Sequence, residues 1–418
     1  MSEIQLLVLF ATAVAFYAAV NIGGNDVSNA MGIVVASKAL TYKQAVIVAA
    51  VFEFCGAFFV GAHVTETVRS GMLDMKYFEG DPNAVIYGMT AALVGTAVWL
   101  RIATQFGWPV STTHSIVGAV VGFGIVARGF HVVNWTKIIS IVSSWLVSPL
   151  AGGVAAFFIF TFLRSYILEA NEPFKRTKAA APYLVFSVVF IVALSMFYKG
   201  LKNLNLDLSA HMSLLIAAGI GLLAALLTAI LIKHYYGNVV DEKTNINYQR
   251  VENIFKYMQI ITACYIAFAH GANDVANAIG PLAAVLAVAK TGEVSMKVPI
   301  PAWLLALGGG GIVIGLILLG RKVIETIGKK ITEIVPSRGF SAEFATATTV
   351  LVCSKMGLPI STTHTIVGAV IGVGFARGMG ALDLRVIREI VSSWFITLPA
   401  TIIFTIAAYK GIVFFMVR

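Results

Sequence analysis

The chain has 418 residues, of which 58% are hydrophobic and only 12% are charged. Soluble domains carry about 25% charged residues, so a soluble core could not bury this much apolar surface. A lipid bilayer is the solvent that suits such a composition. The formal net charge is +10, but the basic residues stand in short gaps between apolar runs. That pattern is typical of loops facing anionic lipid and argues against a nucleic-acid-binding surface.

Apolar runs long enough to cross or nearly cross a bilayer recur along the whole chain. In chain order they cover 4–36, 44–62, 84–100, 112–127, 138–163, 182–199, 210–232, 257–289, 302–320, 342–353, 362–376 and 388–409. We expect the first run and the run at 257–289 to be interrupted. The pieces at 112–127, 342–353 and 362–376 are shorter than the about 20 residues of a straight span. Short pieces next to a Gly-Pro break predict re-entrant hairpins or broken helices, where transporters usually bind their substrates.

Three blocks of the sequence occur twice, in the same order. They are Asn25–Gly32 with Asn273–Gly280, Gly107–Gly124 with Gly357–Gly374, and the Ser-Ser-Trp tripeptides at 143–145 and 392–394. The offsets are 248, 250 and 249 residues, and the second block keeps 13 of its 18 positions. Compositional bias would not preserve this order and spacing, so the pattern indicates a duplication.

The duplication divides the chain into three parts. We expect a first repeat over residues 1–164, a connecting region over 165–256 and a second repeat over 257–418. The connecting region holds two further apolar spans and ends in the polar segment 234–256, which predicts an aqueous loop between the halves. The number of crossings decides whether the copies are parallel or inverted, and the segment count leaves this open. The predicted fold class is an all-α polytopic membrane protein with about 10–12 transmembrane segments.

The second duplicated block contains a helix break followed by a cluster of hydroxyls. Gly and Pro end one helix, and Ser or Thr then caps the next one. The first turn of that next helix exposes unpaired N–H groups and the positive end of the helix dipole, roughly half a charge. With adjacent hydroxyls this makes an anion site that needs no basic side chain. Capping alone is the alternative, but two identical intramembrane copies favour anion binding by Ser111, Thr112, Thr113, Ser361, Thr362 and Thr363.

The first duplicated block places an acid inside a long apolar run of each repeat. A carboxylate there costs about 2.5–3.5 kcal/mol, and no Lys or Arg stands within one helical turn of Asp26 or Asp274. Asp and Asn at i and i+3 share a helix face and offer hard oxygen ligands, and nearby glycines permit unwinding. This predicts a Na⁺ site, or a protonated carboxylate, formed by Asn25, Asp26, Asn29, Asn273, Asp274 and Asn277. Interhelical hydrogen-bonding clamps, or N-caps at helix breaks, are the alternative.

A cation site close to an anion site predicts co-transport, because each ion lowers the cost of desolvating the other. We expect one central anion between the two Ser-Thr-Thr turns, flanked by cations at the two Asp/Asn blocks. Alternating access would then arise as the repeats exchange conformations around this fixed site. The oxygen-rich sets favour Na⁺ over a proton, which would need only the carboxylate.

The two Asn-Asp-Val-x-Asn-Ala blocks and the two Pro-x-Ser-Thr-Thr-His-x-Ile-Val-Gly-Ala blocks resemble the inorganic phosphate transporter (PiT) family. The likeness covers both repeats and hence nearly the whole chain. It implies cation-coupled symport of inorganic phosphate, two inverted repeats with two re-entrant helical hairpins, extracellular termini and a cytoplasmic central loop. It also implies a multi-pass protein of the plasma membrane that carries phosphate with Na⁺ or H⁺, needs no cofactor and forms a homodimer.

Two further acids are candidates for cation coupling or gating. Glu343 lies 16 residues before Pro359 and matches a glutamate that the family associates with phosphate transport. The first repeat departs from this pattern, because relatives carry a glutamate 20 residues before Pro109 and this chain has Met89 there. Any role of that acid is absent here or has moved, with Glu53 as the candidate. An intramembrane hydrogen bond is the alternative for each acid.

Other functions are compatible with parts of the pattern. Sulfate is tetrahedral like phosphate, but only phosphate can donate a hydrogen bond, which Glu343, Asp26 or Asp274 could accept. A proton could replace Na⁺ as the coupling ion, and a passive channel would not need two matched cation sites. A membrane enzyme would need a nucleophile with a base or a metal cluster, and His114 and His364 stand without such partners in the sequence. We therefore predict a transporter, with packing roles for these histidines and for the tryptophans of Ser-Ser-Trp.

Overall fold

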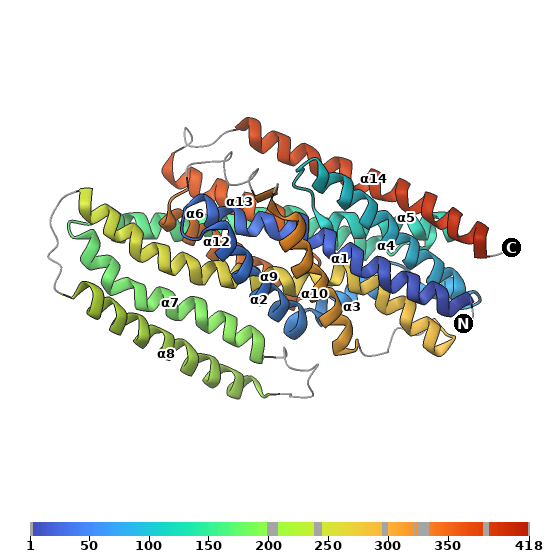
Figure 1. Cartoon of the computed structure of the whole chain (residues 1–418), viewed down its shortest axis with the longest axis horizontal. Helices are drawn as coiled ribbons and strands as arrows, with labels where there is room; N and C mark the ends of the chain where they lie inside the picture. The colour runs from blue at the N-terminus through green and yellow to red at the C-terminus, as the bar shows by residue number, and fades with distance from the viewer. Residues whose placement is uncertain are drawn as a thin grey trace.

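The computed structural model describes residues 3–198, 208–237, 245–294, 300–321, 323–324, 334–378 and 384–416. Over these residues the chain forms long α-helices joined by short turns, and it contains no named strand. The helices lie roughly along one long axis, and α14 ends near the start of α1 (Figure 1).

We group the helices by the predicted repeats and connecting region, although α9 begins at Asn245, before the predicted start of the second repeat at residue 257. The first repeat contains α1 (Glu3–Ala36), α2 (Tyr42–Val60), α3 (Ala62–Ser70), α4 (Pro82–Gln105), α5 (Thr112–Arg128) and α6 (Trp135–Leu163). The connecting region contains α7 (Pro173–Phe197) and α8 (Ala210–Tyr236). The second repeat contains α9 (Asn245–Thr291), α10 (Ala302–Leu319), α12 (Pro336–Lys355), α13 (Thr362–Arg377) and α14 (Leu384–Met416).

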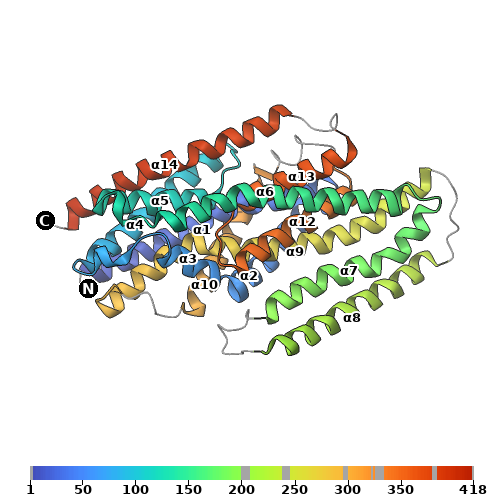
Figure 2. The ribbon, with the colours of Figure 1, turned by 180° about the vertical axis from the view of Figure 1, so that it is seen from behind.

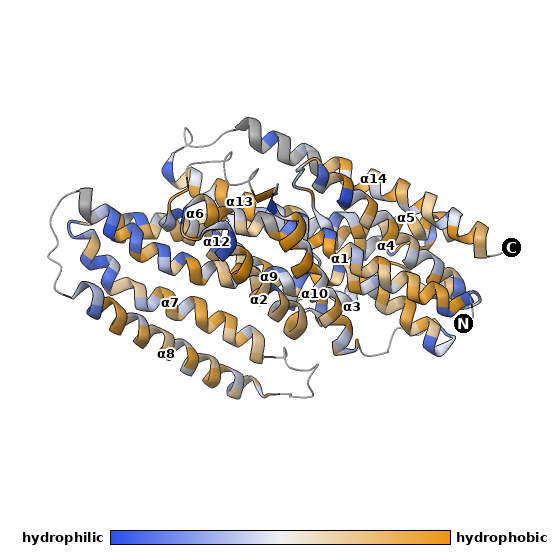
Figure 3. Cartoon of the chain, viewed as in Figure 1, coloured by the Kyte–Doolittle hydropathy of each residue, from blue (hydrophilic) through white to orange (hydrophobic). Residues whose placement is uncertain are grey.

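The hydropathy of these helices confirms an all-α polytopic membrane protein. Within the described residues, nine helices are long and apolar enough to cross a membrane, and α5 is a shorter apolar helix. Hydrophobic residues cover most of the bundle, and hydrophilic residues gather at helix ends such as the starts of α7 and α9 (Figure 3). The most apolar window of α8 has a mean hydropathy of 2.7, yet only 11% of it is buried. Such an exposed apolar surface requires lipid as its solvent.

The two long helices that carry the Asp/Asn blocks, α1 and α9, are continuous, so the predicted interruptions of these runs are wrong. Their glycines serve close packing between helices. A Cβ on Gly23 would lie 1.8 Å from the Ile312 carbonyl oxygen of α10, and one on Gly271 would lie 2.1 Å from the Glu53 carbonyl oxygen of α2. Glycine permits both unwinding and close approach, and in α1 and α9 it is close approach that the fold uses.

The crossing of α1 and α10 offers a matched test of this packing. A Cβ on Gly315 would lie 1.8 Å from the Val20 carbonyl oxygen, whereas one on Gly310 in the same helix would meet nothing within 4 Å. We expect Gly315→Ala to lower the midpoint of thermal unfolding in detergent clearly, since overpacking costs about 1–3 kcal/mol. Gly310→Ala should leave that midpoint unchanged or raise it, because alanine favours the helix. Equal midpoints for the two variants would contradict so close a crossing.

The polar segment 234–256 is only partly a loop, which corrects the prediction for the connecting region. α8 continues to Tyr236 and α9 begins at Asn245, while residues 238–244 lie outside the described part. The start of α9 is helical because it carries a buried apolar stripe at the spacing i, i+3, i+4, i+7. The stripe consists of Val251, Ile254, Phe255 and Met258. The charged residues of this part of the segment therefore occupy the other faces of a helix.

Both predicted helical hairpins are present, and they turn in the same way. α4 and α12 are each followed by a glycine with a φ of 67°, Gly107 and Gly357, two residues before the proline of the motif. The N–H of the residue after each glycine donates to the carbonyl five residues earlier, at 2.9 Å in the first hairpin and 3.0 Å in the second. This left-handed helix end requires glycine and directs the chain into α5 and α13.

The two repeats are interlocked. α6 of the first repeat packs against α12 and α13 of the second, and α14 of the second packs against α4 and α5 of the first (Figure 2). α1 and α9 carry the same motif, pack together and run in opposite directions (Figure 1), as inverted repeats require. This arrangement brings the two hairpin turns and the two Asp/Asn blocks together in the interior.

Candidate functional site

The serines of the two hairpin turns cap the helices that follow them. The Ser111 hydroxyl accepts a hydrogen bond from the His114 N–H at 3.2 Å at the start of α5. The Ser361 hydroxyl accepts from the His364 N–H at 3.2 Å at the start of α13. Both serines are buried, so α5 and α13 begin inside the protein. The predicted cap geometry is present, and anion binding at these turns stays a prediction.

One threonine hydroxyl joins the acids of the two repeats. Thr112 Oγ1 lies 2.7 Å from Asp26 Oδ2 and 3.2 Å from Asp274 Oδ2. Asp26 comes from α1 and Asp274 from α9, and both are buried. Because a hydroxyl carries a single proton, it can donate to only one of these carboxylates at a time. The site therefore holds two acids around one shared donor.

Further contacts cross between the repeats at the same point. Thr363 of the second hairpin donates a hydrogen bond to Asp26 of the first repeat. Asn277 Nδ2 of α9 donates to Thr112 Oγ1 at 3.0 Å and to Thr113 Oγ1 at 3.3 Å in the first hairpin. Six of the predicted site residues, Asp26, Thr112, Thr113, Thr363, Asp274 and Asn277, thus converge in one buried cluster with members from both repeats.

Asn25 and Asn273 hold the hairpin turns in place. Asn25 Nδ2 donates to the Trp108 carbonyl at 2.9 Å, and its Oδ1 accepts from the Val110 N–H at 3.2 Å. Asn273 Nδ2 donates to the Ile360 carbonyl, which corresponds to Val110, at 2.9 Å. These contacts are the clamps that the sequence offered as the alternative. A cation-ligand role for the two asparagines stays a prediction.

The remaining predicted residues of the two motifs take different places. Thr362 is buried, and among the described residues its hydroxyl has no hydrogen-bond partner. The side chain of Asn29 lies outside the described side chains, so its predicted cation contact is not described.

His270 belongs to the cluster and was missed by sequence reasoning. Its Nδ1 lies 2.9 Å from Glu53 Oε2, and its Nε2 lies 3.0 Å from Asp274 Oδ2. All three side chains are buried, so the imidazole bridges the acid of α2 and the acid of α9. Its signal was its position one helical turn before Asp274 on the same face. The duplication concealed it, because the matching position of the first repeat is Ile22.

A small cavity lies beside the cluster. It has a volume of about 10 Å³, close to the least volume that holds one water molecule, and it is lined by Asp26, His270 and Thr362 and by four apolar residues, Ala30, Ile266, Val350 and Ile366. The nearest ligand atoms of Asp26, His270 and Asp274 lie within 4.8 Å of one another. Two of these three ligand atoms are carboxylate oxygens, the third is an imidazole nitrogen, and the Thr112 hydroxyl lies next to both carboxylates. Such oxygens suit a hard cation.

The phosphate transporter family model matches residues 22–405 of the chain. The chain belongs to the phosphate transporter family. It is 46% identical over 390 residues to a putative phosphate permease of Pyrococcus abyssi, covering 93% of this chain and 94% of that protein. It is 42% identical to the chloroplastic inorganic phosphate transporter 2-1 of Arabidopsis thaliana, covering 94% of this chain and 70% of that protein. A solved structure described as the sodium-dependent phosphate transporter is 41% identical, with a TM-score of 0.90 over 97% of this chain and 98% of that one.

These findings confirm the resemblance that the paired motifs indicated. The protein is a phosphate transporter and not an enzyme, and it is a multi-pass protein of the plasma membrane. The identity extends over nearly the whole chain, as the positions of the motifs in both repeats led us to expect.

The two candidate coupling acids of this phosphate transporter lie in different clusters. Glu53 contacts His270, whereas Glu343 accepts hydrogen bonds from Gln259 Nε2 at 2.9 Å and Thr262 Oγ1 at 2.7 Å. Thr262 lies twelve residues before Asp274 in α9, roughly 18 Å along the helix axis. Met89, where the family pattern predicts an acid, is a fully buried core residue. Glu53 is therefore the acid that contacts the central cluster of the transporter.

Aromatic side chains pack beside the hairpin turns of the transporter. The ring centroids of His114 and His364 lie 4.4 Å apart in an edge-to-face arrangement, and the ring centroids of His114 and Trp145 lie 3.7 Å apart. Trp145 Nε1 donates to the Pro359 carbonyl of the opposite hairpin at 3.2 Å. The predicted packing roles agree with these contacts. Ser144 donates to a carbonyl of its own helix, and the side chains of Ser393 and Trp394 lie outside the described ones.

Replacing His270 tests the bridge between Glu53 and Asp274. We expect His270→Gln to lower phosphate uptake by about tenfold or more, the loss typical of a group that orients a functional side chain. A glutamine cannot reach both acids with the geometry of the imidazole. Uptake into proteoliposomes at several Na⁺ concentrations measures the effect. His131→Gln, in the 3₁₀ turn Phe130–Val132 after α5, is the control, and an equal response of both variants would contradict a bridging role.

Proposed function

We propose that this transporter couples phosphate entry to Na⁺, with the cations held by the paired Asp/Asn blocks. The observation that carries the proposal is the shared Thr112 hydroxyl, which contacts Asp26 of one repeat and Asp274 of the other. A cation would offset the repulsion and the desolvation of two buried carboxylates. Binding of that cation would hold the repeats together at the junction of both hairpins.

Two observations support Na⁺ as the coupling ion. The cluster supplies carboxylate and hydroxyl oxygens, which are hard ligands, and the similar solved structure is described as a sodium-dependent transporter. A proton would need only one carboxylate, whereas two carboxylates and the Thr112 hydroxyl oxygen lie close together here.

Phosphate would bind between the starts of α5 and α13, on the hydroxyls and first N–H groups of the two Ser-Thr-Thr turns. The helix dipoles direct partial positive charge to this place, so the anion needs no basic side chain. The Thr113 hydroxyl donates across the gap to the Ile360 carbonyl at 2.9 Å, so phosphate entry requires the two turns to separate. Separation and closure of the turns would then be the alternating-access step.

Cation binding at Asp274 would change the contact between His270 and Glu53. When a cation takes the Asp274 oxygen, the imidazole loses its contact at 3.0 Å and its hydrogen bond to Glu53 must adjust. α2 and α9 are packed backbone to backbone at Gly271, so such an adjustment would move the two helices relative to each other. Glu343 would act separately, through its own partners on α9.

Reconstituted uptake tests the proposal directly. Purified protein in proteoliposomes should accumulate radioactive phosphate when an inward Na⁺ gradient is imposed at equal pH on both sides, and not when K⁺ replaces Na⁺. Arsenate should compete with uptake and sulfate should not. Uptake driven by a pH gradient without Na⁺ would establish proton coupling, and uptake indifferent to both gradients would establish a passive channel. Either result would overturn Na⁺ symport.

A further inference from the structure

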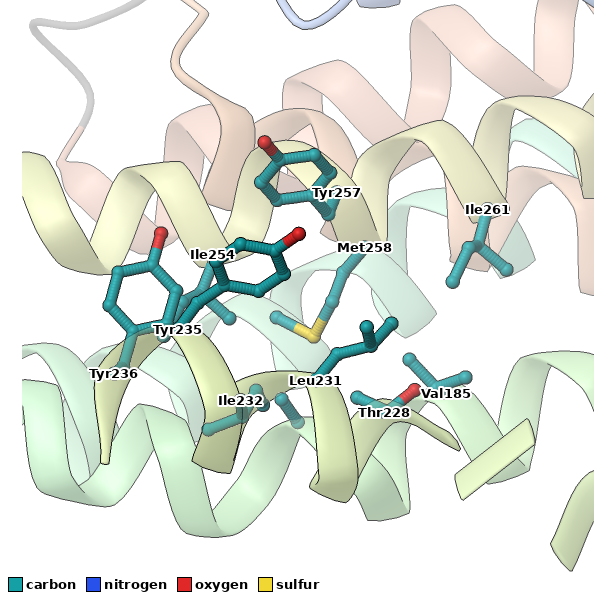
Figure 4. Close-up of a pocket in the computed structure, with 11 residues that line it drawn as sticks. Val185, Thr228, Leu231, Ile232, Tyr235, Tyr236, Ile254, Tyr257, Met258 and Ile261 are labelled. Atoms are coloured by element: carbon teal, nitrogen blue, oxygen red, sulfur yellow. The ribbon is translucent and has the colours of Figure 1, made fainter. Parts of the chain in front are cut away.

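A second cavity lies far along α9 from the central cluster. It has a volume of about 410 Å³, within the range of about 300–1,000 Å³ of small-molecule sites. Val185 of α7 lies at its base, Leu231 and Ile232 of α8 form one wall, and Met258 and Ile261 of α9 form the other (Figure 4). α7 packs against both α8 and α9, so the cavity is an apolar groove between two helices that share a neighbour.

Three tyrosines stand at one end of this groove. Tyr235 and Tyr236 end α8, and Tyr257 lies across from them on α9 (Figure 4). Tyr235 is 70% exposed and Tyr257 is 64% exposed. Tyrosine rings with an apolar body and a polar tip are enriched where the hydrocarbon of a membrane meets its headgroups. The tyrosines therefore place this end of the groove at the membrane interface.

Two basic residues lie against the same tyrosine end. The Lys178 ammonium lies 3.2 Å from the Tyr236 carbonyl oxygen and 4.7 Å from the centre of the Phe174 ring. The Arg250 guanidinium lies 6.0 Å from the centre of the same Phe174 ring, which packs edge-to-face on the Tyr236 ring. The tyrosine end of the apolar groove thus lies near two basic residues, Lys178 and Arg250, which do not line the cavity itself. This combination complements a molecule with a hydrocarbon chain and a negative headgroup.

We propose that the groove binds one anionic phospholipid. An acyl chain lies between α8 and α9 over Val185, and the headgroup phosphate lies at the tyrosine end near Lys178 and Arg250. Basic pockets between transmembrane helices on the cytoplasmic side bind acidic headgroups in this way. α8 contains no Asp or Glu, so no acid of that helix repels the headgroup. The lipid fills the space between α8 and the helix that carries Asp274.

Native mass spectrometry of the purified full-length protein tests the proposal. The probes are phosphatidylglycerol and phosphatidylcholine with the same acyl chains, added to the delipidated protein in detergent. We expect the wild type to prefer phosphatidylglycerol, with about a fivefold gain for each basic residue. Lys178→Gln combined with Arg250→Gln should abolish this preference while phosphatidylcholine binding stays. Lys43→Gln, at an exposed lysine of α2, is the control for charge and should keep the preference.

A second pair of variants tests the groove itself. Thr228→Trp of α8 fills the cavity and should remove the tightest lipid-binding event, whereas Leu222→Trp on the exposed face of the same helix should not. Equal phosphatidylglycerol binding by the wild type and by Thr228→Trp would overturn the proposal. A wild type without headgroup preference would also overturn it. A change of oligomeric mass in Thr228→Trp with unchanged lipid binding would assign the groove to a second copy of the chain instead.

Discussion

Replacing Asp274 with asparagine should reduce Na⁺-driven phosphate uptake by more than about a hundredfold, and Asp26→Asn should do the same. Groups that only orient a metal ligand cost about 10–100-fold when lost, and these acids are the proposed ligands themselves. Each substitution keeps the size of the side chain and removes one of two charges around Thr112. Initial uptake rates in proteoliposomes, measured across a range of Na⁺ concentrations, give the effect.

The matched control for both variants is Asp74→Asn. Asp74 is exposed and caps a short 3₁₀ helix, a role that asparagine fills equally well. Its uptake and its Na⁺ dependence should equal those of the wild type. If Asp26→Asn and Asp274→Asn both kept the Na⁺ stimulation of the wild type, the cation would not bind at these acids. Thermal midpoints in detergent separate a loss of coupling from a loss of folding.

Thr112→Val and Thr362→Val should change different kinetic properties of uptake, although the two threonines occupy equivalent positions in the duplication. Thr112 bonds to the acids of both repeats, whereas the Thr362 hydroxyl has no partner among the described residues. Valine has nearly the shape of threonine but removes the donor that the two carboxylates share. A hydrogen bond to a charged group contributes about 1.5–3 kcal/mol. We expect Thr112→Val to lower uptake at least about tenfold and to raise the Na⁺ concentration needed for half-maximal uptake.

Thr362→Val should raise the KM for phosphate more than the Na⁺ concentration needed for half-maximal uptake, because under the proposed function its hydroxyl binds the anion and it does not contact the two acids. Thr112→Ser and Thr362→Ser keep the hydroxyl and should restore most of the uptake. Uptake curves against phosphate at saturating Na⁺, and against Na⁺ at saturating phosphate, distinguish the two effects. Identical changes in both curves for the two valine variants would show that the hairpins contribute equivalently to both ions.

Most of the fold and much of the site could be predicted from the sequence, for identifiable physical reasons. Apolar runs predict helices because backbone groups in lipid must bond within their own segment. Gly107 and Gly357 before the prolines predict the hairpins because the helix end needs a left-handed residue. The duplication predicted that both Asp/Asn blocks would lie near the hairpin turns, on either side of a central anion. That Asp26 and Asp274 both contact the Thr112 hydroxyl was not predicted.

What could not be predicted depends on contacts between distant segments. His270 has no counterpart in the first repeat, so a comparison of the repeats did not mark it. Its partner Glu53 is set by the close approach of α2 at Gly271, and a glycine does not reveal whether it unwinds a helix or admits a neighbour. The same ambiguity led to the wrong prediction of interrupted helices. The helical start of α9 was concealed because its polar residues outnumber the apolar stripe that packs it.

The exchange of terminal helices between the repeats means that neither half is a complete building unit. α6 covers the hairpin of the second half, and α14 covers that of the first. In a polypeptide with a single repeat, no helix of the other repeat would cover the hairpin. The hairpin could be covered only by a second copy of the polypeptide in the opposite orientation. A gene split between α8 and α9 should therefore yield two fragments that accumulate when they are synthesised together and are degraded when either is made alone.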